Sequence, residues 1–122
     1  MHGWIWLFLF AALLFISMLL RRRGQIATGE AREFLLHGAL LIDVRTPAEF
    51  SAGHLPQAIN IPLDQLESEV PRRAPQKDKV LLLHCQSGAR SATAQRQLRA
   101  LGYMRAYNLG SYARAAQIAG RG

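Results

Sequence analysis

The chain has 122 residues, enough for one domain, and half of them are hydrophobic. Its formal net charge of +7 could suggest a nucleic-acid partner, but three of the positive charges are the adjacent Arg21, Arg22 and Arg23. The other basic residues are scattered among acids without interleaved aromatic residues, so we attribute the charge to membrane and solubility chemistry and expect no nucleic-acid partner.

The first predicted element is an apolar segment, residues 4–20, which contains no charge and one polar residue, Ser17. As a helix it would be roughly 25 Å long, close to the roughly 30 Å of a bilayer's hydrocarbon core. A cleaved signal peptide would need a basic residue before this run and a small-x-small site after it, and a helix of a soluble core would need a polar face. The pattern therefore predicts a membrane anchor over residues 1–23.

The three arginines that follow the apolar segment predict its orientation. Basic residues beside a spanning helix tend to remain in the cytoplasm. We therefore expect a single-pass membrane protein whose remaining residues, 24–122, form a cytoplasmic domain, with a periplasmic domain as the alternative. A lone cysteine also suits a reducing compartment.

Strands and helices alternate along the rest of the chain. Apolar runs predict strands at residues 26–27, 39–42, 58–61 and 79–83. Helical spacing and stop signals predict helices at residues 30–37, 47–52, 62–69 and 90–101. We expect Thr28 to cap the first of these helices and residues 70–79, with two prolines and several charges, to be a surface connection. The alternation predicts a three-layer α/β domain with a mostly parallel sheet.

Asp43 and Arg45 follow the strand predicted at residues 39–42. Ligands of parallel sheets bind beyond the carboxyl ends of the strands, so both side chains are candidates for a site at that rim. Asp43 would either orient Arg45 and the neighbouring loop or cap the turn that begins at Thr46. An ion pair between Arg45 and Glu49 is a further alternative. We expect no metal site, because no Cys/His metal pattern is present.

The only cysteine, Cys85, stands between a predicted strand and a predicted helix. The first amides of a helix lack partners and carry the positive end of its dipole. Gly88 lets the loop curl with its N–H groups inward, which would form a cradle for an anion and favour the thiolate. Arg90 adds a permanent positive charge. We therefore interpret Cys85 as a nucleophile, with an inert buried thiol as the alternative.

The segment Cys85–Ser91 is similar to the Cys-x-x-Gly-x-Arg-Ser active loop of the rhodanese family of sulfurtransferases. Residues 43–50 and 53–62 resemble that family's other signature, and residues 102–103 and 107–110 fall where it has a Gly-Tyr pair and a following strand. The resemblance covers about residues 26–119 and implies the rhodanese-like three-layer α/β/α fold with about five strands. The chain departs from the family at residues 110–115, where the frequent Gly-Gly-x-x-x-Trp lacks its tryptophan.

The resemblance also implies a reaction. Cys85 would take sulfane sulfur from thiosulfate or a persulfide donor, carry it as a persulfide and pass it to a thiophilic acceptor such as cyanide or a cellular thiol. Arg90 would assist binding of the donor anion, and no metal or organic cofactor would be needed. The persulfide would be stabilised by the surrounding loop, which consists of Gln86, Ser87, Gly88, Ala89 and Ser91.

Two alternatives to this reaction stay open. Related cysteine phosphatases place five residues between cysteine and arginine, whereas four separate Cys85 from Arg90, so a phosphatase or arsenate reductase is disfavoured. A membrane-tethered module that binds a partner or relays sulfur, with little turnover, is the other alternative. Its acceptor protein is not identified by the sequence.

Overall fold

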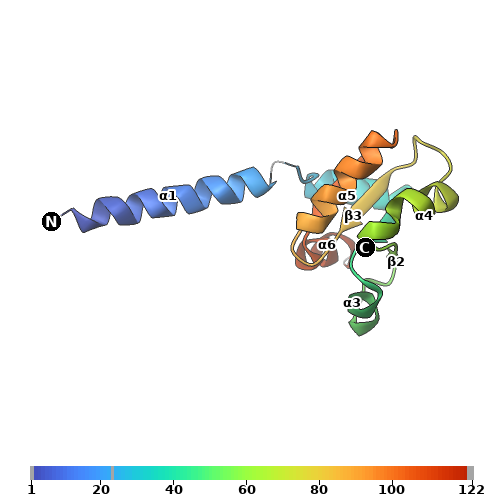
Figure 1. Ribbon diagram of the computed structural model, residues 1–122, viewed down its shortest axis with the longest axis horizontal. Helices are drawn as coiled ribbons and strands as arrows, with labels where there is room; N and C mark the ends of the chain where they lie inside the picture. Colours follow the sequence, from blue (N-terminus) through green and yellow to red (C-terminus); the bar gives the residue numbers. More distant parts are fainter. Residues whose placement is uncertain (1, 23, 121–122) are drawn as a thin grey trace.

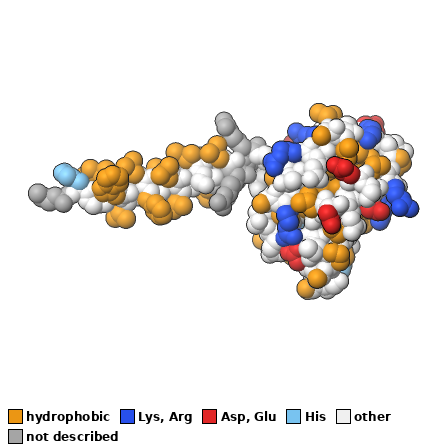
Figure 2. All heavy atoms as spheres, viewed as in Figure 1, with side chains coloured by type: hydrophobic (Ala, Val, Ile, Leu, Met, Phe, Trp, Pro, Cys, Tyr) orange, Lys and Arg blue, Asp and Glu red, His pale blue; other side chains and the backbone are white. Residues whose placement is uncertain are grey.

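The computed structural model describes residues 2–22 and 24–120 of the chain. Helix α1 (Gly3–Arg22) projects away from an α/β unit formed by the later residues (Figure 1). Within α1 the window Gly3–Leu20 has a mean hydropathy of 2.4 and none of it is buried. Apolar side chains surround the helix (Figure 2). By length and composition α1 is a candidate membrane span, and a signal sequence would share both properties; Arg23 of the predicted basic stop lies outside the described residues.

The described residues form one sheet of four parallel strands in the order β2-β1-β3-β4. The strands are β1 (Leu40–Asp43), β2 (Ile59–Asn60), β3 (Leu81–His84) and β4 (Ala106–Gly110). The edge strand predicted at residues 26–27 is reduced to a bridge between Gln25 and Asn108. The register pairs Asp43 with His84 and His84 with Gly110, so these strand ends meet at one edge of the sheet.

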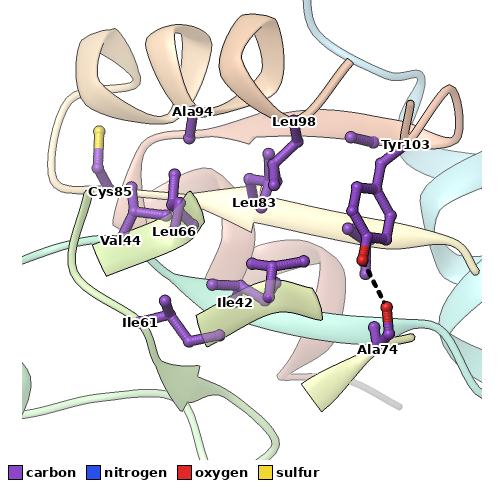
Figure 3. Packing of buried hydrophobic residues seen from close by; sticks show 13 residues of the cluster. Ile42, Val44, Ile61, Leu66, Ala74, Leu83, Cys85, Ala94, Leu98 and Tyr103 are labelled. Carbon is purple, nitrogen blue, oxygen red and sulfur yellow. Dashed lines mark hydrogen bonds between the residues drawn. The ribbon is translucent and has the colours of Figure 1, made fainter. Parts of the chain in front are cut away.

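Helices cover both faces of the sheet, which confirms the predicted three-layer arrangement (Figure 1). The main helices are α2 (Thr28–Leu36), α4 (Leu66–Arg73), α5 (Ala89–Ala100) and α6 (Tyr112–Ala119). Side chains alternate along β1: Leu41 faces the core under α2 and α6, while Ile42 faces the core under α4 and α5. Figure 3 shows the second of these cores, in which the Tyr103 hydroxyl donates to the Ala74 carbonyl at 2.7 Å.

Two helix predictions were wrong in detail. Thr28 is not a cap, because α2 begins at this residue and the cap position falls on Ala27, whose side chain cannot accept a hydrogen bond. The helix predicted at residues 62–69 is split into a 3-10 turn, η1 (Leu63–Gln65), and α4, which continues through Pro71 into the predicted connection. Burial of Val70 on the inner face of α4 outweighs the hydrogen bond that Pro71 cannot donate.

Helix α6 packs against the sheet without the tryptophan that residues 110–115 lack. Ala115 takes that position in α6 and is fully buried against the sheet. The helix is capped by Ser111, whose hydroxyl accepts a hydrogen bond from the Arg114 N–H at 3.1 Å. A small residue therefore lets α6 lie close to the sheet.

Candidate active site

Cys85 lies between β3 and α5, at the carboxyl edge of the sheet, and its side chain is buried. The sulfur points toward the first turn of α5 (Figure 3). Its Sγ accepts a hydrogen bond from the Gly88 N–H at 3.0 Å and one from the Ser91 hydroxyl at 3.5 Å. The loop between strand and helix thus surrounds the sulfur with donors, as expected for a cradle that holds an anion.

These donors decide the ionisation of the thiol. Burial raises the pKa of Cys85, but hydrogen bonds from Ser91, Gly88 and Ser87 oppose it and prevail, so the pKa lies below its ordinary value. Three other residues of the loop, Gln86, Ser87 and Ala89, are exposed. A thiolate held by donors in this way is chemically a nucleophile and can carry a second sulfur as an anion.

Two glycines allow the backbone of the cradle to approach the end of β4. Gly88 and Gly110 have φ angles of +99° and +94°, in the left-handed region that favours glycine. A Cβ on Gly88 would lie 3.3 Å from Gly110 Cα, and a Cβ on Gly110 would lie 2.6 Å from Gln25 Nε2. The Cys85 N–H donates to the Gly110 carbonyl at 3.2 Å, which ties the two segments together.

Asn108 supports this arrangement from β4. Its side-chain oxygen accepts from the Gly110 N–H at 2.8 Å, and its amide donates to the Gly88 carbonyl at 3.4 Å. Its own carbonyl accepts from the Ile26 N–H at 3.1 Å, beside the bridge formed by Gln25. The sequence analysis missed Asn108 as a supporting residue, although a polar residue within a buried strand is a usable signal for one.

Asp43 and Arg45 form a buried ion pair next to the cradle. The Asp43 carboxylate accepts from Arg45 Nη2 at 2.7 Å, from Nε at 3.0 Å and from the Arg45 backbone N–H at 3.0 Å. The hydrogen bond to Asp43 is the main cause that raises the pKa of Arg45. Arg45 also donates to the Gly53 carbonyl at 2.7 Å and to Gln86 Oε1 at 3.3 Å. Arg45 therefore connects the segment after β1 to the active loop.

Glu49 pairs with Arg90 and not with Arg45, so the alternative pairing considered above is wrong. Arg90 donates to the two carboxylate oxygens of Glu49 at 2.6 and 2.9 Å. The reason is the position of α3 (Pro47–Ala52), which places Glu49 beside the first turn of α5, while the nearer Asp43 takes Arg45. The hydrogen bond from Arg90, aided by Thr46, lowers the pKa of Glu49 to about 2.

The sequence analysis did not single out His84, which is fully buried directly before Cys85. Its Nδ1 lies 3.1 Å from the Cys85 carbonyl and must carry the hydrogen of that bond, which leaves Nε2 facing Asp43 Oδ2 at 3.6 Å. Burial is the main cause that lowers the pKa of His84. His54, by contrast, shapes a turn: its Nδ1 lies 2.8 Å from the Phe50 carbonyl, and its ring stacks on Phe50. Within residues 2–22 and 24–120, no three His, Cys, Asp or Glu side chains are placed to hold a metal ion.

Comparisons with known proteins agree with this geometry. Residues 28–115 match the family described as the rhodanese-like domain. A sulfurtransferase of Allochromatium vinosum is 41% identical over 73 residues, which cover 57% of this chain and 64% of that protein. The thiosulfate sulfurtransferase PspE of Escherichia coli is 33% identical over 69 residues, covering 57% of this chain and 66% of that protein. The chain thus spans just under two thirds of the length of both relatives.

A solved structure is also similar. The human single-domain sulfurtransferase TSTD1 has 33% sequence identity and a TM-score of 0.67, covering 77% of this chain and 96% of that chain.

Proposed function

The chain belongs to the rhodanese-like domain family, and from this we propose that it is a sulfurtransferase that moves sulfane sulfur from thiosulfate or a persulfide donor to a thiophilic acceptor through a persulfide on Cys85. The observation that carries the proposal is the environment of the sulfur, which accepts hydrogen bonds from Gly88 and Ser91 at the amino end of α5. The lowered pKa of Cys85 and the sulfurtransferase relatives support it.

In the first step the Cys85 thiolate attacks the outer sulfur of the donor. The sulfur–sulfur bond of the donor breaks, its electron pair leaves with sulfite or with an organic thiolate, and Cys85 holds the persulfide. The N–H of Gly88 and the Ser91 hydroxyl remain in place to stabilise the persulfide anion. In the second step an acceptor thiolate or cyanide attacks the outer sulfur, and the Cys85 thiolate leaves. No oxidant or reductant is consumed.

The other candidate residues have supporting roles in this proposal. Arg45, fixed by Asp43, orients Gln86 and thereby the start of the loop. Arg90 faces the donor from the first turn of α5. Glu49, which is paired with Arg90, reduces the positive charge that Arg90 presents to the donor.

We further propose that residues 1–23 anchor the protein in a membrane and that residues 24–122 form the sulfurtransferase domain on the cytoplasmic side. The exposed apolar surface of α1 supports the anchor. The bridge from Gln25 to Asn108 supports a short connection, because only two residues separate it from the end of α1.

Thiocyanate formation from thiosulfate and cyanide tests the activity. The full chain, purified in detergent, is compared with Cys85→Ser, and a phosphate ester serves as a second substrate. We expect turnover that requires Cys85 and no hydrolysis of the ester. Phosphate release without thiocyanate would contradict the proposal and favour the phosphatase alternative.

A further inference from the structure

Both arginines of the candidate site, Arg45 and Arg90, are already paired with a carboxylate. Arg45 is bound to Asp43 at 2.7 Å, and Arg90 is bound to both oxygens of Glu49. Each pair is formally neutral. The attraction for an anionic donor then comes mainly from the loop amides and from the amino end of α5, which is equivalent to about half a unit charge. The Cys85 thiolate opposes that attraction.

Glu49 is also held in place from its other side. Its Oε1 accepts from the Thr46 N–H at 3.1 Å and from the Thr46 hydroxyl at 3.2 Å, and the Glu49 N–H donates back to that hydroxyl at 3.2 Å. This reciprocal arrangement is the capping box of α3. If the Glu49 side chain turned away to free Arg90, the capping box of α3 would lose the two hydrogen bonds that the carboxylate accepts from Thr46. The carboxylate is therefore a fixed negative charge beside the position of the donor.

A groove beside Arg90 offers space for more than a small anion. It has a volume of about 440 Å³ and lies between α5 and the segments that follow β1 and β2. Val44, Pro62 and Leu63 line it, and its charged lining residues are Asp64 and Arg90. An organic group with some apolar surface and an ammonium suits this lining, because it gains apolar contact and attraction to Asp64, while the neighbouring Glu49–Arg90 pair is formally neutral.

We propose that the sulfur donor is an organic persulfide of the aminothiol class and that Glu49 selects this donor over thiosulfate. This inference rests on the proposed function. Thiosulfate brings two negative charges to a rim whose arginines are compensated, whereas the leaving group of an aminothiol persulfide carries an ammonium. The Cys85 thiolate attacks the outer sulfur of R–S–SH, the sulfur–sulfur bond breaks, and the aminothiol leaves as a thiolate that takes up a proton. Selection of this kind is a difference in transition-state stabilisation between two donors.

The test measures the rate at which Cys85 gains one sulfur, by intact-protein mass spectrometry in a single turnover. The donors are thiosulfate and cysteamine persulfide at low ionic strength, and the protein is the full chain in detergent. The variants are Glu49→Gln, which removes the charge, and Glu49→Asp, which keeps it. Glu33→Gln is the matched control, because Glu33 is exposed on α2, which covers the opposite face of the sheet.

Glu49→Gln should raise the loading rate with thiosulfate about five- to tenfold and leave or lower the rate with cysteamine persulfide, and high salt should shrink the difference. Glu49→Asp and Glu33→Gln should keep the wild-type ratio of the two rates. Each ratio compares the loading rates of one protein with the two donors. A general loss of activity in a variant therefore lowers both rates and leaves their ratio unchanged. If Glu49→Gln is loaded by both donors with the wild-type ratio of rates, this inference alone is overturned. Loading from neither donor in the wild type would overturn the proposed function and this inference with it.

Discussion

Replacing Ser91 with alanine should reduce the fraction of Cys85 that is thiolate about five- to tenfold at any pH below the inflection. The single hydroxyl hydrogen of Ser91 has three acceptors within reach: the Gly88 carbonyl at 3.2 Å, the Gly110 carbonyl at 3.4 Å and Cys85 Sγ at 3.5 Å. It can donate to a carbonyl while the thiol is neutral and turn to Sγ when the thiol ionises. The gain is then the difference between a charged and a neutral hydrogen bond, about 1–1.5 kcal/mol, and about 1.4 kcal/mol is a factor of ten.

The assay is the ultraviolet absorbance of the thiolate as a function of pH, with Cys85→Ser as the blank. Because Cys85 is the only cysteine, the signal has one source. Loss of a donor to the thiolate raises the pKa, so the inflection should move to higher pH. Thr93→Ala is the matched control. It removes a hydroxyl of the same helix, and that hydroxyl donates to the Ala89 carbonyl. An inflection in Ser91→Ala that stays in place, or moves to lower pH, would refute the reasoning.

Three further predictions concern the surrounding network. Asp43→Asn should lower the free energy of unfolding by about 3 kcal/mol, measured with urea, because Arg45 is left buried without its counter-charge; a fully stable variant would contradict this. Tyr103→Phe should cost about 1–2 kcal/mol and lower the Tm by several degrees without changing sulfur loading, since a buried carbonyl loses its donor. The Glu49 carboxyl, followed by NMR, should titrate near pH 2, and Arg90→Ala should raise its pKa toward the ordinary 4.5. Because the folded state lowers this pKa, the pair's contribution to stability should be complete above pH 4.5 and be lost as the pH falls toward about 2. If the Glu49 carboxyl of the wild type titrates at the ordinary value, the pair is not formed.

The fold follows from signals that are local in the sequence. The continuous apolar runs before Asp43 and before His84 predict strands buried on both faces, and both were found within one or two residues of the predicted positions. Gly88 and the helical spacing after it predict the strand-to-helix turn that holds Cys85. These features depend on neighbours along the chain, so a sequence is enough to find them.

The sequence was less informative where the outcome depends on distant residues. Arg45 and Glu49 are four residues apart and could have paired, but α3 lies beside α5, so Glu49 pairs with Arg90. In the same way, α4 continues through Pro71 because burial in the core outweighs a local stop signal. Such choices among partners are settled by packing, which spacing along the chain does not encode.

The sequence also did not predict that Gln25, in the segment after α1, supports the cradle. The bridge of Gln25 to Asn108 and the contact of its side chain with Gly110 join residues more than eighty positions apart. Gly110 has a visible sequence signal, because it ends a strand. The identity of the side chain that fills the space beside it became apparent only from the structure.

The central claim is that Cys85 carries the transferred sulfur, and the most direct measurement is the mass of the full chain after a brief exposure to thiosulfate or cysteamine persulfide. The account predicts a gain of one sulfur that maps to the peptide containing Cys85, disappears when cyanide is added with formation of thiocyanate, and is absent in Cys85→Ser. A folded wild-type protein that gains no sulfur from either donor would contradict the account, as would a gain that persists in Cys85→Ser.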